Sequence, residues 1–223
     1  VALCLFVGAI QVSIAVSAVL LTVTLVLCVG ALISQRERLE LPITFRPLVA
    51  YSVLTMVSVV ASINPLASLL DSREVLLFLV VPLVHQLARG RRASTVASII
   101  ITFGAVTAVL GIVQYGIFEF DSLGQRPLGS MGHYMTYSGL LMLVIGLAAA
   151  RLLFGETDRL WAGLVLPALL VALTLTLTRS AWVGACVGGS FLLIMKDRRL
   201  LAVAPVVAAI FFAIAPPTVT DRV

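Results

Sequence analysis

Charged side chains are scarce in this chain of 223 residues: Asp, Glu, Lys and Arg together make up 11% of it, while hydrophobic residues make up 61%. An ordinary globular domain carries roughly 25% charged residues. A water-soluble fold of this length cannot bury so much apolar surface, so the composition excludes a soluble enzyme and a disordered tail. A mean hydropathy of +1.17 instead predicts an all-α, polytopic membrane protein.

Cysteine, histidine and acidic residues are also few. The three cysteines stand singly in apolar runs, which excludes a disulfide framework and a paired-cysteine zinc site. No cluster of acidic or histidine residues offers ligands for a metal ion, so we expect neither a metal nor a cofactor. No Asp or Glu lies in the middle of a predicted span, which argues against a proton- or sodium-coupled transporter.

The apolar runs define the expected helices, because a membrane-spanning helix needs about 20 largely apolar residues. Residues 1–33 form a run too long for one span, and Gln11, Ser13 and Ser17 suggest a break near residues 10–13. We therefore expect a single transmembrane domain over residues 1–223, a helix bundle with about eight full spans and a partial first helix. The predicted spans are 1–10 (partial), 13–33, 47–63, 75–88, 94–118, 134–153, 160–177, 181–195 and 200–214.

Positive charge concentrates on alternate loops, as the positive-inside rule requires of cytoplasmic loops. Eleven of the 15 Lys and Arg residues lie in loops 34–46, 89–93, 151–159 and 196–199. We assign these loops to the cytoplasm, and we attribute the net charge of +5 to topology rather than to nucleic-acid binding. The outward set is Arg73, Arg126, Arg179 and Arg222.

All four outward basic residues are arginines. The planar guanidinium matches phosphate oxygens bidentately and stays charged, so these residues suit a lipid-linked phosphate or diphosphate. The alternative for each is a phospholipid head group or a helix end. Arg179 stands out because it lies in a short turn between two apolar runs, where a charge needs a partner. The closest acids, Asp158 and Asp197, are assigned to the other side, so an anionic ligand is expected.

Arg126 and His133 share the glycine-bearing loop 124–133 on the same outward side. Its three glycines permit tight backbone turns near a ligand. A neutral His133 imidazole could take a proton from a hydroxyl, which makes it a weak candidate for a catalytic residue. The alternative is a role at the start of a helix or in hydrogen bonding. His85 is expected to be structural.

Three stretches carry a resemblance to a known family. They are Arg126-Pro-Leu-Gly129 through Gly132-His133 with Tyr137-Ser-Gly-Leu140, then Leu177-Thr-Arg-Ser-Ala-Trp-Val-Gly184, and finally Ala215-Pro-Pro-Thr-Val-Thr-Asp-Arg222. In their order, spacing and common outward side they resemble the O-antigen ligase/polymerase family of bacterial inner membranes. The resemblance covers the whole chain but only about the first half of a typical member.

The resemblance implies a multi-pass inner-membrane protein of lipopolysaccharide biosynthesis in the cell envelope, similar to the metal-independent C-type glycosyltransferases. A glycan on undecaprenyl diphosphate would move to an acceptor hydroxyl, either on lipid A-core or on another repeat unit. The match to the motifs implies that Arg126 and Arg179 bind the diphosphate. Arg73 and Arg222 are weaker candidates, as outward arginines. The family's base is a histidine on a large periplasmic loop, which we expect after residue 216 and which this chain lacks. We therefore expect the chain alone to be inactive, with its base unidentified.

Two alternatives stay open. One is a transporter or flippase of an anionic lipid-linked substrate, which would favour charged residues inside spans. The other is a non-catalytic membrane subunit or remnant. A hydrophilic, histidine-bearing loop and further spans beyond Val223 would favour the enzyme.

Overall fold

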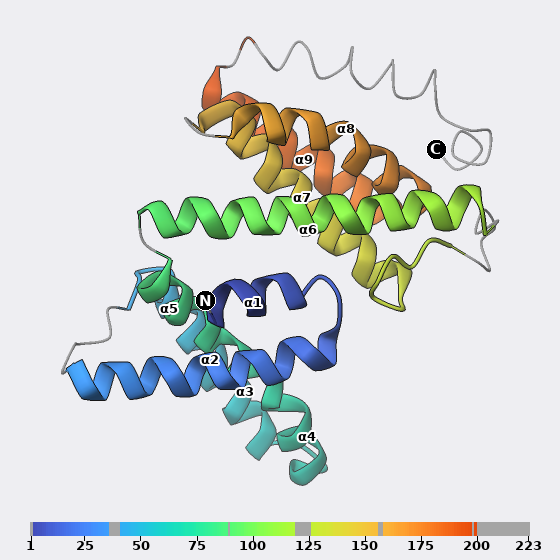
Figure 1. Cartoon of the computed structure of the whole chain (residues 1–223). Coiled ribbons are helices and arrows are strands. Elements are labelled where there is room, and N and C mark those ends of the chain that lie inside the picture. Colours follow the sequence, from blue (N-terminus) through green and yellow to red (C-terminus); the bar gives the residue numbers. More distant parts are fainter. Residues whose placement is uncertain are drawn as a thin grey trace. The chain divides into compact units, whose positions relative to one another are not determined.

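The computed structural model describes residues 2–35, 41–88, 90–118, 126–155, 158–197 and 199. All regular structure in these ranges is helical, which confirms the all-α class (Figure 1). The elements are α1 (Ala2–Ala9), α2 (Ile14–Gln35), α3 (Phe45–Val60), α4 (Pro65–Asp71), the 3-10 helix η1 (Ser72–Leu79), α5 (Val80–Leu87), α6 (Arg91–Gly116), α7 (Tyr134–Phe154), α8 (Arg159–Leu175) and α9 (Arg179–Lys196).

Two helices of the described chain are long and apolar enough to cross a bilayer: Arg92–Gly116 and Tyr134–Phe154. Their length and composition favour a membrane protein. Shorter apolar helices occupy Ala15–Leu27, Phe45–Val60 and Arg159–Leu175. A bundle of about eight spans stays a prediction, and its last span, 200–214, lies outside the described residues.

The break that we expect near residues 10–13 is present, since α1 ends at Ala9 and α2 begins at Ile14. Gln11 explains why the chain turns there. Its side chain is only 1% exposed, and its amide Nε2 donates to the backbone carbonyl of Ile100 over 2.8 Å. A buried polar side chain must find such a partner, and Gln11 finds it on α6.

The region after α3 differs from expectation. The predicted spans 47–63 and 75–88 leave residues 64–74 as a connection, but the backbone there is helical through α4 and into η1. Pro65 occupies the first turn of α4, where its missing N–H costs nothing and its fixed φ favours a helix. A few charges were therefore not enough to predict a loop.

Chain contacts divide the protein into two compact units. The first is Val1–Phe6 with Ser17–Val96, and the second is Val7–Val16 with Ala97–Val223. In the first unit an edge-on contact between the Tyr51 and Phe78 rings, 5.8 Å between centroids, packs α3 against η1. The prediction of a single transmembrane domain stays untested.

The second unit is built on α7, which packs against both α8 and α9 (Figure 1). Short connections join α7 to α8 and α8 to α9, so α7 and α9 run in the same direction and begin at the same end. Gly184 of α9 leaves the space that Met142 of α7 fills, a close helix approach typical of small residues in membranes. The buried cluster of this unit includes Ile101, Ala108, Tyr137, Leu141, Val144, Leu169, Ala172, Leu173 and Ala181.

Tyr137 ties α6 to α7. Its ring is fully buried, and its hydroxyl donates to the carbonyl of Thr107 over 2.7 Å. Gly111 and Gly129 make room for the ring, because a Cβ on either glycine would overlap it. Gly129 also adopts a φ of +56°, a conformation that side-chain-bearing residues rarely accept.

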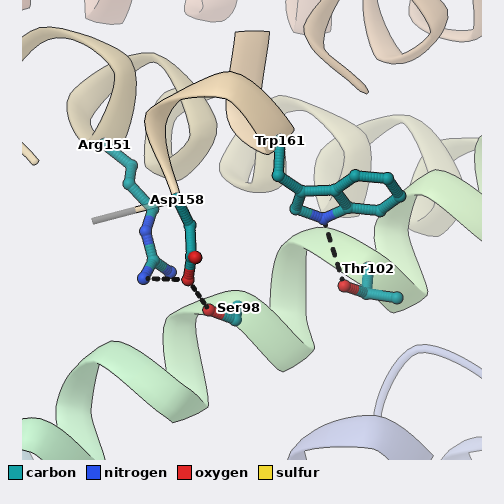
Figure 2. Close-up of polar contacts among 5 residues, drawn as sticks. All are labelled: Ser98, Thr102, Arg151, Asp158 and Trp161. Atoms are coloured by element: carbon teal, nitrogen blue, oxygen red, sulfur yellow. Dashed lines mark hydrogen bonds and ion pairs between the residues drawn. The ribbon is translucent and has the colours of Figure 1, made fainter. Parts of the chain in front are cut away.

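The opposite end of the unit, where α7 ends and α8 begins, is held by an ion pair (Figure 2). Arg151 donates to the Asp158 carboxylate over 3.0 Å, and Ser98 of α6 donates to the same Asp158 oxygen over 3.0 Å. Nearby, the indole of Trp161 donates to the Thr102 hydroxyl over 3.3 Å. These contacts join α6, α7 and α8 at one end.

Replacing Asp158 with alanine is expected to destabilise the protein by about 1–2 kcal/mol, less than a fully buried pair would cost, because the carboxylate is half exposed. The Arg151 side chain, only 8% exposed, would keep its charge without this partner. Thermal unfolding in detergent measures the loss. Asp158→Asn, which retains an acceptor for Ser98 and Arg151, should recover about half of it. An unchanged melting temperature for the alanine variant would contradict this role.

Candidate functional site

Three of the residues predicted to form the site lie at one end of the second unit. Arg126 and His133 lie in the segment that leads into α7, and Arg179 is the first residue of α9. Because α7 and α9 begin at the same end, these residues share it. Arg151, Arg159 and Lys196 lie at the opposite end. This separation follows the alternation of charged loops in the sequence, while the membrane side of each end stays a prediction.

The segment that carries Arg126 is held by Gln114 of α6. The Gln114 Oε1 accepts hydrogen bonds from the backbone N–H groups of Leu128 and Gly129, at 2.9 and 2.8 Å. Its Nε2 donates to the Gly129 carbonyl over 2.9 Å. Gln114 was not among the residues that we predicted. A glutamine within an apolar helix was the available signal, since its amide must be satisfied.

A second anchor comes from the turn between α1 and α2. The Ser130 hydroxyl donates to the backbone carbonyl of Gln11, whose side chain binds α6. The segment next to Arg126 is thus attached to α6 and to the Gln11 turn. Pro127, which follows Arg126, is fully buried. The backbone at Arg126 is therefore well constrained.

His133 caps α7. Its Nδ1 accepts a hydrogen bond from the backbone N–H of Met135 over 3.3 Å, and its ring is exposed. This confirms the alternative role at a helix start. Since Nδ1 acts as an acceptor, we assign the neutral ring its proton on Nε2. In that tautomer the exposed nitrogen is a donor, and the role of His133 as a catalytic candidate stays a prediction.

Arg126 and His133 meet at one aromatic ring, that of Tyr134. The Arg126 guanidinium carbon lies 4.4 Å from the Tyr134 ring centroid, within the range of a cation–π interaction. The His133 ring stacks on Tyr134 with 5.0 Å between centroids and 18° between planes. The Arg126 Nε is buried and makes no hydrogen bond within the described chain. Tyr134 was not among the residues that we predicted.

Arg179 follows a buried turn but is itself exposed. Leu177 adopts a φ of +52°, and the carbonyl of Leu173 accepts from the Thr176 hydroxyl at 2.6 Å and from the Trp182 indole at 3.1 Å. Trp182 and Thr176 thereby stabilise the α8–α9 connection. Arg179, which follows this connection as the first residue of α9, has an exposed side chain. The anionic partner that we expect for Arg179 stays a prediction.

The predicted set is therefore brought together only in part. Arg126 and His133 share Tyr134, while Arg179 lies at the same end on a different helix. Arg73 belongs to η1 in the first unit, and its side chain is outside the described part of the structure. Arg222 also lies outside the described residues. Among the described side chains, no group of three His, Cys, Asp or Glu residues could hold a metal ion.

In comparisons with family models, curated proteins and solved structures, nothing matches this chain. The resemblance of its motifs to the O-antigen ligase/polymerase family thus stays a prediction. What the structure describes at this point is an arginine- and histidine-bearing end of an all-helical unit.

Proposed function

We propose that this chain belongs to a membrane glycosyltransferase of the O-antigen ligase/polymerase type. Such an enzyme moves a glycan from undecaprenyl diphosphate to an acceptor hydroxyl on lipid A-core or on another repeat unit. The observation that carries this proposal is the position of Arg126 and Arg179 at one end of the second unit. Arg151, Arg159 and Lys196 lie at the opposite end of the same unit.

The chemistry of glycosyl transfer explains why arginines would lie there. As the acceptor oxygen bonds to the anomeric carbon, the bond from that carbon to the diphosphate oxygen breaks. Negative charge then builds on the departing diphosphate. A fixed cation that donates hydrogen bonds to these oxygens stabilises the transition state more than the ground state. Arg126 and Arg179 supply such cations.

The orientation of this end follows from the positive-inside rule. Loops 89–93, 151–159 and 196–199 would face the cytoplasm of a bacterium, so the Arg126 end would face the periplasm. A lipid-linked diphosphate lies at this depth of the membrane, with its isoprenoid in the bilayer and its glycan in water. The base that removes the acceptor proton is not assigned to any residue of this chain.

Glycan transfer by the full-length protein in liposomes tests the proposal. Arg126→Gln is expected to lower kcat/KM by about 10–100-fold, because it removes charge-assisted hydrogen bonds to the diphosphate. Arg159→Gln is the matched control, since it removes the same charge at the opposite end. Equal rates for the two variants would contradict the site. Translocation of the lipid-linked glycan without transfer would instead favour a flippase.

A further inference from the structure

We propose that Arg126, Tyr134 and His133 form one anion-binding unit, in which Tyr134 is a positioning residue for the Arg126 guanidinium and His133 donates from Nε2. The identity of the anion, the diphosphate of a lipid-linked substrate, rests on the function proposed above. The role of Tyr134 rests on the geometry of the three side chains.

The stack on Tyr134 constrains the guanidinium. At 4.4 Å from the ring centroid, one face of the Arg126 guanidinium is covered by the aromatic ring. The N–H groups of a guanidinium lie in its plane, so covering a face leaves them available for hydrogen bonds. Tyr134 thus restricts the orientation of Arg126 without using any of its donors.

Arg126 also has an unused donor. Its Nε is buried, and it forms no hydrogen bond with any residue that the structure describes. A buried donor without an acceptor is costly. Asp158, an acid among the described residues of this unit, forms an ion pair with Arg151 at the opposite end. A phosphate brings two oxygens that match Nε and a terminal nitrogen together.

His133 adds a second donor, from a ring that stacks on the same Tyr134 side chain. Its Nδ1 is engaged by the Met135 N–H, which leaves Nε2–H for a ligand. Its ring stacks on Tyr134 at 5.0 Å, so both donor groups contact one aromatic side chain. This Nε2–H can therefore donate to an anion oxygen.

The surrounding structure already orders this unit. Gln114 fixes the backbone at Gly129, and Ser130 attaches the segment to Gln11. The main conformational entropy that binding would then remove is that of the Arg126 side-chain rotamers. The stack on Tyr134 already reduces this entropy. Preorganisation of this kind increases affinity by lowering the entropic cost of association.

The test uses the full-length protein in phosphatidylcholine nanodiscs, with undecaprenyl diphosphate as the binding probe. Tyr134→Leu, which removes the aromatic face, is expected to weaken binding by about 3–10-fold. Tyr134→Phe, which keeps the face, should bind like the wild type. In the double variant with Arg126→Gln, the tyrosine change should add little, because two residues that act through one contact are not additive. A merely structural tyrosine would give additive losses.

His133→Asn isolates the second donor. Asparagine is a favourable N-cap residue, so the thermal unfolding of this variant should match the wild type. Loss of the Nε2–H should weaken probe binding by about threefold or more. Unchanged binding would remove His133 from the unit.

Competitors identify the source of the anion. Displacement of the probe by inorganic pyrophosphate, but not by phosphatidylglycerol in the nanodisc, supports diphosphate recognition. Equal displacement by phosphatidylglycerol assigns the unit to phospholipid head groups and overturns the proposed substrate. If the wild type binds the probe and Tyr134→Leu binds it equally well, the inference fails while the proposed function stands. A wild type that binds none of these anions overturns both.

Discussion

Replacing Arg179 with alanine is expected to lower glycan transfer by the full-length protein by about 100-fold or more, the usual effect of losing a transition-state donor. The side chain is exposed at the first position of α9, so its removal leaves no cavity and should not unfold the protein. The loss should therefore fall on kcat rather than on the amount of folded protein. Single-turnover transfer from undecaprenyl-diphosphate-linked glycan measures it.

Two further variants separate charge from geometry at this position. Arg179→Lys keeps the charge but loses the planar fork, so its rate should lie between those of the wild type and the alanine variant. Ser180→Ala changes the next exposed residue of the same turn and should transfer normally. Normal transfer by Arg179→Ala would exclude the residue from diphosphate binding.

Replacing Gly129 with alanine is expected to destabilise the protein by about 2–5 kcal/mol, which combines left-handed backbone strain with overpacking. Gly129 has a φ of +56°, and a Cβ there would overlap the Tyr137 ring. The ring cannot move easily, because its hydroxyl is bonded to Thr107. Thermal unfolding in detergent measures the loss, and weaker probe binding should accompany it because the same segment carries Arg126.

Gly132→Ala is the matched control for this substitution. Gly132 has a φ of +71°, but a Cβ there would meet no atom within 4 Å. This variant should lose only the backbone contribution, about 1–2 kcal/mol. Equal losses at Gly129 and Gly132 would show that the contact with Tyr137 contributes nothing.

The sequence was most informative where long apolar runs end at charged loops. Helices α6, α7, α8 and α9 lie close to the predicted segments 94–118, 134–153, 160–177 and 181–195. An apolar segment of this length must satisfy its own backbone hydrogen bonds, and a helix does so locally. Where the runs are short and interrupted, as between Asn64 and Leu87, α4 and the start of η1 were not predicted.

Of the residues that carry the proposed binding site, the arginines were the easiest to predict from the sequence. Arg126 and Arg179 stand out because an outward charge opposes the trend of the loops, which is a property of the sequence. Tyr134 has no such signal, and Gln114 has only a polar amide within an apolar helix. Their roles depend on which backbone groups and side chains the fold brings beside them. Local sequence patterns do not predict contacts between residues that are distant along the chain.

Hydropathy and charge act locally along the chain, so the helical class, the break before α2 and the separation of basic residues between loops could be predicted from the residues alone. The folded structure was needed to show that His133 caps α7, that Tyr134 contacts both Arg126 and His133, and that Gln114 holds the segment between them. These contacts arise from helix packing. Helices of equal hydropathy can pack in several ways, and a single buried amide or a single glycine can favour one of them.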